Sequence, residues 1–541
     1  MNVSKFEKIR RAELSKQRDR NVRFFKIGSV LMLTLLVIYL YNAILRSYTR
    51  GMGSDAKVSF TEWKNQVSRI FSEVKKKNPF YGQNCLTVKE PAPIQVTSWE
   101  HLVKDVTDDK SAADAILSRQ TLLKAPRFSE ERLLLTAKEL IDAAIDSKLL
   151  GLYQKRKQDS LAPRVLLLNG GAFEWGYTGD ARVTLGEIVQ WTDLMSAFLV
   201  LGADVSFVTR RDDLPLILCP LISGKFDIIV TDYVGAFTLD QAIAAGELTS
   251  PVVVAKGRSM IISGAEGPSA LTRVIDAKTY VLDYFGTDAD RNYAVWSEDG
   301  KNNLYCCRHL PLSRFLTAYN RPPNTFLGGL VLPNKKKKAS EKREQTVVIY
   351  GKLCSFLKRT PSAYSTISLL RKLGWRVVDT FHVDDAEMTQ CELPKDSEHL
   401  GVLNQKELLE LMRSSRILLG IGRPLIGPMP LEAVANGMVV VLPRYGTPLS
   451  CTDDEDLSVK PIECKQGEWT SQHPKLEKLA NDKGATNVHI VDFSDEEAVT
   501  KIANNVASLQ DDDFKDTLGV VSDYHPDAFL QRVAEIMKSV V

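Results

Sequence analysis

The sequence of 541 residues lacks several features that would assign it to a common class. Its basic and acidic residues nearly balance, 70 against 67, and much of the small excess lies before residue 27, so nothing indicates nucleic-acid binding. No two of its eight cysteines form a Cys-x-x-Cys pair, which argues against a structural zinc site. No second apolar run of membrane-spanning length follows residue 45. We therefore expect two or three water-soluble domains after that residue.

Acceptor triplets for N-linked glycans are also missing beyond the N-terminus. The only Asn-x-Ser/Thr triplet begins at Asn2, and in the topology argued below it lies in the cytoplasm, where it stays unmodified. The even number of cysteines is compatible with a few disulfides in an oxidising compartment, but the sequence does not determine their pairing.

One long apolar run is present, at residues 27–45, between Lys26 and Arg46. Nineteen residues without charge suit a helix that crosses the roughly 30 Å hydrocarbon core of a bilayer. The segment 1–26 carries nine lysines and arginines against three acidic residues, and such a basic flank stays in the cytoplasm. A buried helix of a soluble protein is the alternative. We predict a type II membrane protein with a cytoplasmic tail at 1–26, a transmembrane signal anchor at 27–45 and a lumenal remainder.

The lumenal part divides into a polar leading segment and two α/β regions. Residues 46–160 are polar, with helical patterns but no repeated strand signal, and we predict a stem followed by the first helices. Beyond them, short β-branched runs alternate with helical patterns, as is typical of parallel sheets covered by helices on both faces. The ten runs lie at 165–168, 205–208, 228–230, 252–254, 280–282, 347–350, 377–378, 417–419, 439–442 and 489–491.

A charged segment at 334–344 separates the first five runs from the last five, and it has the composition of a linker or an exposed loop. We therefore predict two doubly wound, Rossmann-like α/β domains, 161–334 and 335–541, that face a cleft. In such sheets ligands bind outside the carboxyl ends of the strands. The loops that follow the runs are thus the place to look for site residues.

The strongest local pattern lies at 417–437, where an apolar run ends in glycines and a loop leads into a short helix. Gly422 lets a backbone approach a ligand closely, and Pro430 suits the first helical turn. A helix N-terminus attracts a diphosphate, so a diphosphate is the expected ligand here. We expect Arg423 to contact its phosphate and Glu432 to accept hydrogen bonds from ribose hydroxyls. Alternatively, this is an ordinary strand-loop-helix connection in which Glu432 only complements the helix dipole.

Six segments of this sequence resemble, in the same order, segments of a known transferase family. They are Leu185–Leu194, Asp283–Thr287, Phe326–Gly328, Tyr350–Lys352, Pro430–Gly437 and Thr470–Pro474. Each segment alone is a weak signal, but agreement at six places in order is improbable by chance. From about residue 160 to the C-terminus, the sequence resembles the alpha-1,6-mannosylglycoprotein 6-beta-N-acetylglucosaminyltransferase family, also called N-acetylglucosaminyltransferase V.

This resemblance implies a fold, a reaction and a compartment. The fold is GT-B, and the reaction is a metal-independent, inverting transfer of N-acetylglucosamine from UDP-N-acetylglucosamine. The acceptor is the 6-hydroxyl of the alpha-1,6-linked mannose arm of an N-glycan on a glycoprotein. The protein is then expected in the Golgi membrane, with its catalytic part in the lumen. The resemblance further implies that Glu187 is the catalytic base and that Glu432 and Lys460 bind the donor.

Glu187 lies early in a helical pattern that follows a loop at 170–184. An inverting transfer needs a carboxylate to take the acceptor proton and a positive group to stabilise the departing diphosphate, and Glu187 and Lys460 suit these two parts. Without the resemblance, Glu187 would be read as a first-turn glutamate that only complements the helix dipole, and Lys460 as a surface lysine. Glu174, in the loop, is a weaker candidate for acceptor contact, and His473 is given no role.

The sequence also departs from the family pattern. Residues 423–426 read Arg-Pro-Leu-Ile, where the family usually has Phe-Pro-Tyr-Glu, and Val459 replaces the glycine before Lys460. The segment 170–183 is different and shorter, which leaves the acceptor arm open, and we expect a short form without the family's cysteine-rich C-terminal extension. Two alternatives remain: a GT-B transferase with another acceptor, such as O-mannose glycans, and a non-catalytic glycan-binding Golgi protein.

Overall fold

The structure is a computed structural model that describes most of the chain after residue 98. The described residues are 99, 103–117, 127–155, 162–168, 185–208, 226–232, 235, 252–255, 258–261, 278–284, 310–332, 343–351, 353–360, 362–383, 392–422, 426–445, 470–510 and 521–540. The predicted cytoplasmic tail and transmembrane anchor, residues 1–45, lie outside them. Within the described ranges, no helix has the length and apolarity needed to cross a membrane.

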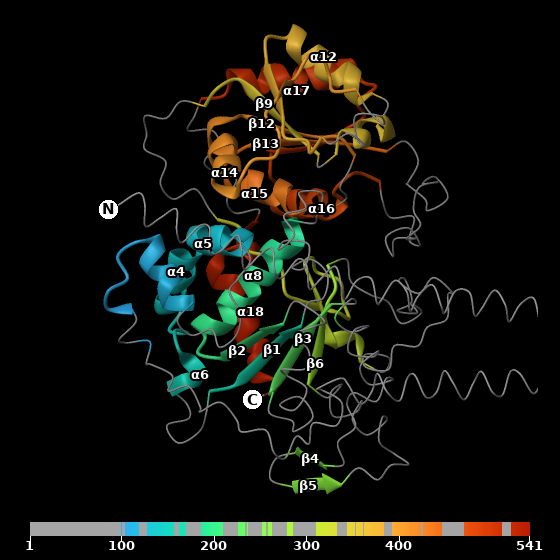
Figure 1. The fold of residues 1–541 in the computed structure, drawn as a ribbon. Helices are drawn as coiled ribbons and strands as arrows, with labels where there is room; N and C mark the ends of the chain where they lie inside the picture. Colours follow the sequence, from blue (N-terminus) through green and yellow to red (C-terminus); the bar gives the residue numbers. More distant parts are fainter. Residues whose placement is uncertain are drawn as a thin grey trace, which may run out of the picture. The chain divides into compact units, whose positions relative to one another are not determined.

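The first sheet has six parallel strands in the order β2-β1-β3-β6-β7-β8 (Figure 1). Its strands are β1 (Arg164–Leu168), β2 (Asp204–Val208), β3 (Ile228–Thr231), β6 (Thr279–Leu282), β7 (Phe315–Thr317) and β8 (Thr325–Phe326). Four predicted runs form β1, β2, β3 and β6, and nearly all of their residues are buried. These predictions are confirmed. The sequence predicts neither β7 nor β8, because segments of three and two residues carry no periodic signal.

One predicted strand lies elsewhere. The run at 252–254 forms β4 (Val252–Ala255), but β4 pairs antiparallel with β5 (Arg258–Ile261) in a separate two-stranded sheet. The prediction that this run belongs to a parallel sheet is therefore wrong. Apolarity predicts a strand without naming its partner, and a second strand that follows within a few residues can pair with the first as a hairpin.

The second sheet also has six parallel strands, in the order β11-β10-β9-β12-β13-β14. Its strands are β9 (Thr346–Tyr350), β10 (Arg376–Asp379), β11 (Glu398–His399), β12 (Ile417–Gly420), β13 (Val439–Pro443) and β14 (Val488–Val491). All five runs predicted for this half lie in this one sheet, which confirms them. In sequence terms the order is third, second, first, fourth, fifth and sixth, the arrangement of a Rossmann fold, whose ligand crevice lies where the order reverses. Here that point lies between the ends of β9 and β12.

Helices cover both sheets and connect their strands. They are α4 (Asp109–Leu117), α5 (Arg127–Asp146), α6 (Leu152–Lys155), α8 (Leu185–Val200), α12 (Ala363–Lys372), α14 (Gln405–Ser414), α15 (Met429–Ala435), α16 (Pro474–Lys483), α17 (Glu496–Ser508) and α18 (Pro526–Lys538). Local chemistry explains several helix ends. At α14, Asn404 and Glu407 form a reciprocal capping box, which satisfies two amides of the first turn. At the end of α16, Gly484 adopts a left-handed conformation, with φ of 64°, as a helix terminator does.

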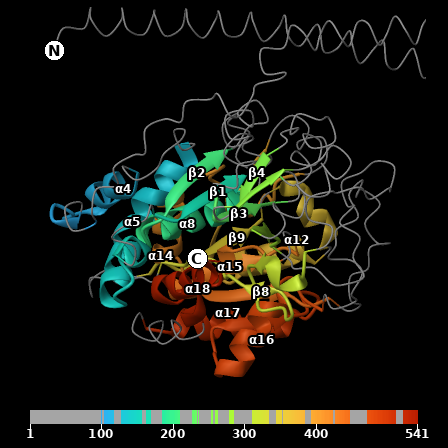
Figure 2. The ribbon, with the colours of Figure 1, turned by 90° about the horizontal axis from the view of Figure 1, so that it is seen from below.

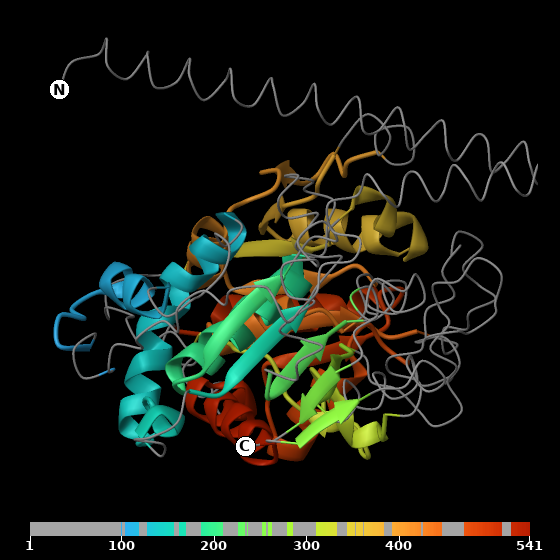
Figure 3. The same ribbon diagram turned by 60° about the horizontal axis from the view of Figure 1, so that its bottom comes forward.

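The core of the first sheet is built from distant parts of the chain. Leu140 of α5, Trp191 and Phe198 of α8, and Phe529 and Met537 of α18 belong to one buried cluster. In Figures 1 and 3 the red helix α18 lies near the C-terminus, and it contacts α5 and α8. In Figure 2 α4 and α5 lie next to α8. The first core thus includes a helix from the region predicted as stem and leading helices, and the last helix of the chain.

Candidate active site

The N-termini of α8 and α15 meet where the two sheets present their carboxyl ends. Gly186 packs so closely on the ring of Pro428 that a Cβ added there would lie 3.2 Å from its Cδ and Cγ atoms. Glu187, the next residue, lies in the first turn of α8 and is partly exposed. Glu432 lies in the first turn of α15. The structure therefore brings the two predicted carboxylates to the same junction.

A buried guanidinium holds this junction together. Arg132 of α5 is 3% exposed, and it donates two hydrogen bonds of 2.9 Å to the two carboxylate oxygens of Asp193 on α8. It also donates to the carbonyl oxygen of Leu330 at 2.7 Å and to Oε1 of Glu432 at 3.1 Å. One arginine thus connects two helices of the first core, the segment before residue 333 and the helix α15 of the second half.

Burial dominates the electrostatics of this cluster. It raises the pKa of Asp193 to about 6, and the charge of Arg132 opposes that rise. Burial also raises the pKa of Glu432, and again Arg132 opposes it. The two carboxylates raise the pKa of Arg132, whose guanidinium stays charged throughout the working range. At neutral pH one positive charge therefore faces two carboxylates.

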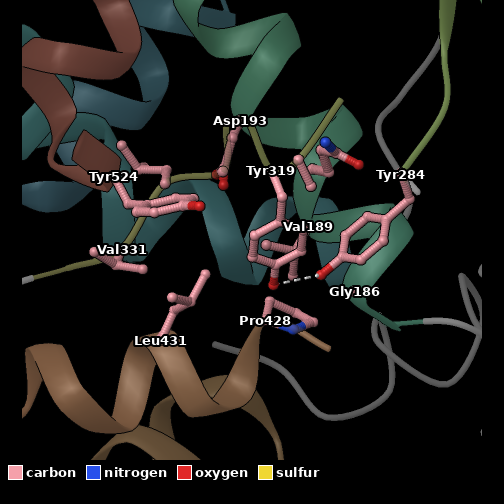
Figure 4. Close-up of a pocket in the computed structure, with 13 residues that line it drawn as sticks. Gly186, Val189, Asp193, Tyr284, Tyr319, Val331, Pro428, Leu431 and Tyr524 are labelled. Carbon is pink, nitrogen blue, oxygen red and sulfur yellow. Dashed lines mark hydrogen bonds between the residues drawn. The ribbon is translucent and has the colours of Figure 1, made fainter. Parts of the chain in front are cut away.

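Two tyrosines of the first half bind the loop that follows β12. The hydroxyls of Tyr284 and Tyr319 each donate a 2.8 Å hydrogen bond to the carbonyl oxygen of Ile426, and Figure 4 shows the two hydroxyls turned toward each other. Burial raises the pKa of Tyr284, and the charges of Glu187 and Glu432 raise it further. Tyr284 thus lies within electrostatic reach of both predicted site carboxylates. Ile426 has φ of +40°, which is unusual for a β-branched residue.

His473 is neutral and contacts Tyr319, which in turn binds the loop after β12. Its Nδ1 accepts a 2.9 Å hydrogen bond from the amide of Leu476, which caps α16, so the ring proton lies on Nε2 and is donated to Tyr319 Oη at 3.0 Å. His473 is fully buried, and burial lowers its pKa to about 3. His473, for which no role was predicted, is therefore a structural contact between Tyr319 and the start of α16.

Gly422 lies in a cradle of neutral polar groups at the end of β12. Its amide donates a 2.9 Å hydrogen bond to Oε1 of Gln472, and its carbonyl oxygen accepts a 2.7 Å bond from the hydroxyl of Tyr445. It has φ of +87°, and an added Cβ would collide with Oγ1 of Thr360. Glycine is thus required here twice, for its backbone angle and for its lack of a side chain; the predicted approach of a ligand to Gly422 stays a prediction.

A small hollow, partly open to solvent, is lined by residues of both halves, among them Tyr284, Tyr319 and Pro428. Figure 4 shows it between α8, which carries Val189 and Asp193, and α15, which carries Leu431. Tyr524 and Val331 complete the wall on the far side. Its lining is mainly apolar, with tyrosine hydroxyls and the Asp193 carboxylate as polar points, which is a common composition for a ligand site.

The other predicted site residues lie outside the described residues. They are the donor candidates Arg423 and Lys460 and the acceptor candidate Glu174; their roles stay predictions. The helix N-terminus expected to bind a diphosphate offers few amides, because Pro428 and Pro430 have none and the amide of Glu432 donates to Pro428.

Several site residues were missed by the sequence reasoning. Asp193 and Tyr284 lie inside two of the segments that carry the family resemblance, so the sequence contained a feature that could have predicted their place near the site. No such feature marks Arg132, which lies in a segment predicted as leading helices, where a helical arginine is usually exposed. None marks Tyr319 either, because its partners Ile426 and His473 follow more than a hundred residues later.

Neither metal ligands nor zinc cysteines gather at the described site. The described residues hold no group of three or more histidine, cysteine, aspartate or glutamate side chains suited to a metal ion. Cys354 forms a disulfide.

Comparison with curated proteins identifies relatives of one kind. The chain is 26% identical over 367 residues to the human alpha-1,6-mannosylglycoprotein 6-beta-N-acetylglucosaminyltransferase A, which covers 64% of this chain and 44% of the relative. It is 26% identical over 406 residues to the Caenorhabditis elegans enzyme of the same family name, which covers 71% of this chain and 55% of the relative. The chain thus spans about half the length of these relatives.

Solved structures with a similar chain course are more distant. A glycosyltransferase from Rickettsia africae has a TM-score of 0.39 and 11% identity over 70% of this chain and 99% of that one. Anabaena HepE, solved with UDP and glucose, has a TM-score of 0.37 and 12% identity over 70% of this chain and all of that one. At such scores these likenesses assign neither the fold nor the function.

The family itself is established by a match over half of the chain. Residues 268–539 match the model of glycosyltransferase family 18. The matched region begins before β6 and includes the second sheet, the Gly422 cradle, the helix α15 with Glu432, and α18. The chain belongs to glycosyltransferase family 18.

Proposed function

We propose that this protein transfers N-acetylglucosamine from UDP-N-acetylglucosamine, in beta-1,6 linkage and with inversion, to the alpha-1,6-mannose arm of N-glycans. Membership of family 18 and the printed names of the relatives support the substrate class. The observation that carries the proposal is the contact between Gly186 and Pro428, which brings together the first turns of α8 and α15 with Glu187 and Glu432. The two Rossmann-like sheets are proposed to form a GT-B pair around this junction.

In this proposal each carboxylate has a separate part. Glu187 takes the proton of the mannose 6-hydroxyl as that oxygen attacks the anomeric carbon, and the bond from that carbon to the diphosphate oxygen breaks, so UDP leaves. Glu432 accepts hydrogen bonds from the donor ribose. Lys460 supplies positive charge to the leaving diphosphate, and we expect the reaction to need no metal ion.

The same proposal includes a place in the cell. The charge asymmetry around residues 27–45 supports a single membrane anchor with the catalytic part in the Golgi lumen. The disulfide of Cys354 agrees with an oxidising lumen, because disulfides are rare in the cytosol. Protease digestion of sealed microsomes that carry a doubly tagged chain tests this topology: a tag at the N-terminus should be removed and a C-terminal tag protected.

The activity is tested with the full chain in detergent. The chain is incubated with UDP-N-acetylglucosamine, a biantennary N-glycan and a metal chelator, and UDP release and product linkage are measured. We expect UDP release that depends on the acceptor, with a new branch at mannose O6. A branch at another position would reassign the acceptor, and absence of both release and transfer would contradict the enzymatic function. UDP-glucose, in place of the donor, controls for sugar selectivity.

A further inference from the structure

We propose that Arg132 is a positioning residue for the nucleotide-sugar donor: it fixes one oxygen of the Glu432 carboxylate so that the other faces the ligand. The inference rests on the proposed function, in which Glu432 binds the donor. It goes beyond that function because Arg132 lies at the start of a helix that precedes both Rossmann-like sheets, outside the region matched by the family model.

The first support is the orientation of the guanidinium. Two parallel hydrogen bonds of 2.9 Å to Asp193 fix its plane, and the 2.7 Å bond to the Leu330 carbonyl fixes its direction. These three bonds involve only the first core and the segment that leads out of it. The Arg132 guanidinium is therefore held in place without any contribution from Glu432. Its Nη1, which takes no part in these three bonds, donates to Glu432 of the second half.

The second support is the division of roles between the two oxygens of Glu432. Oε1 accepts the 3.1 Å bond from Arg132, whereas Oε2 forms no hydrogen bond with any residue in the described ranges. The Glu432 side chain keeps 18% of its surface exposed, against 4% for Arg132. The carboxylate is thus anchored at its buried side and open at the other, which is the arrangement expected of a group that accepts a ligand hydroxyl.

The third support is energetic. A single guanidinium paired with Asp193 would satisfy the charges of the first core. Adding Glu432 places a second carboxylate near the same positive charge, and burial already raises its pKa. Burying an extra negative charge is costly for stability, so the stability of the fold does not explain Glu432 at this position. A role toward a ligand does, because functional sites retain such unfavourable groups.

The arrangement also relates the donor to the catalytic base. Arg132 and Glu432 are 300 residues apart in sequence, and Arg132 is fixed to α8, the helix that carries Glu187. A donor bound by Glu432 is thereby held in register with Glu187. A shift of about 1 Å between reacting groups can lower a rate roughly a hundredfold, so this link matters for transfer as well as for binding.

A double-mutant cycle on the full chain tests the proposal. Arg132→Met, Glu432→Gln and the double variant are compared for the Kd of UDP and for the KM and kcat with UDP-N-acetylglucosamine. We expect each single change to raise the Kd and the donor KM roughly 10- to 100-fold, the range for a lost hydrogen bond to a charged group. The double variant should bind UDP no more weakly than Glu432→Gln alone, because Arg132 acts through Glu432.

Two further variants separate positioning from mere stability. Arg416 is another buried arginine, whose Nη1 donates to the carbonyls of Val506 and Leu509 and not to Glu432. Arg416→Met should lower the Tm but leave the UDP Kd within about twofold. Arg132→Lys keeps the charge without the planar fork, and it should recover part of the lost affinity even if Arg132→Met folds poorly.

Three outcomes would overturn the inference. Effects that multiply in the double variant would mean that Arg132 acts on the donor without Glu432. Tighter UDP binding by Arg132→Met would mean that the arginine competes with the donor for Glu432. Equal loss of affinity in Arg416→Met would reduce the effect to general destabilisation. By contrast, a wild-type chain that binds no UDP contradicts the proposed function itself, and the inference with it.

Discussion

The two sides of the candidate site are built from different kinds of groups. The first half supplies charges: Glu187, Asp193 and Arg132 lie on helices packed into a large shared core. The loop side of the second half supplies glycine backbone and neutral polar groups, among them Gln472 and the uncharged His473. A buried charge is tolerated when it is paired and hydrogen-bonded, as Arg132 and Asp193 are here, whereas neutral polar groups need only hydrogen-bond partners.

This difference indicates how work is divided in the proposed reaction. On the first side, a carboxylate of defined position suits proton transfer, because a general base needs a suitable pKa and must lie within hydrogen-bond distance of the proton. On the second side, glycine allows a charged diphosphate to approach the backbone closely. We therefore expect a change of Glu187 to lower kcat, a change of Arg132 to weaken donor binding, and changes on the second side to alter folding and donor binding.

The largest expected effect comes from the charged side. Glu187→Gln should lower kcat by about 10²- to 10⁴-fold, the usual contribution of a general base, and leave the UDP Kd within about twofold. Steady-state kinetics and UDP titration measure the two quantities. Glu496→Gln, at an exposed first-turn glutamate of α17, is the matched control, because it removes the same dipole interaction. An equal, small effect of both changes would mean that Glu187 only complements its helix.

The next effect lies on the neutral side. Gly422→Ala should lower the free energy of unfolding by about 3 kcal/mol, because a left-handed φ costs about 1–2 kcal/mol and the new methyl collides with Thr360. Gly401→Ala is the control: φ is +69° there, but nothing lies within 4 Å of an added Cβ, so about 1 kcal/mol should be lost. Urea unfolding measures both. Equal losses would show that the cradle can open to admit a side chain.

The two sides also differ in what the sequence could predict. Five of the six strands of the second sheet were predicted, because each of the five contains a run of β-branched and other apolar residues. In the first half, the hairpin partner of 252–254 and the short strands β7 and β8 were not predicted from the sequence, since strand pairing depends on tertiary context. The packing of α5 and α18 on one core was not predicted for the same reason.

For the site, the sequence predicted what is local and what the resemblance carries. Gly422 and Glu432 belong to one continuous strand-loop-helix pattern, and Glu187 belongs to a segment shared with the family. Arg132 could not be found in this way. Its three partner elements lie 61, 198 and 300 residues away, and no spacing rule along a single helix encodes contacts over such separations.

A smaller effect tests the neutral state of His473. Its pKa is about 3 when folded and about 6.5 when unfolded, so the unfolded state binds an extra proton between these values and stability falls as pH falls below about 6.5. Between pH 7 and pH 5 this costs about 2 kcal/mol. His473→Asn keeps a cap acceptor for α16 but cannot titrate. Urea unfolding at both pH values measures the free energy of unfolding, whose change between pH 7 and pH 5 should be smaller by this amount in the variant. An unchanged difference between the two pH values would mean that His473 is charged in the fold.

The smallest effect lies where the two sides touch, at the Ile426 carbonyl. Tyr284→Phe removes one of the two hydroxyls that donate to this oxygen, but the other, from Tyr319, remains at 2.8 Å. Unfolding in urea should therefore show a loss of about 1 kcal/mol, the net value of one hydrogen bond. Tyr319→Phe should cost about 2 kcal/mol, because it also leaves the buried Nε2 of His473 without its partner. Equal losses would contradict this account, since the two tyrosines would then support the loop equally and the link to His473 would contribute nothing to the contact between the halves.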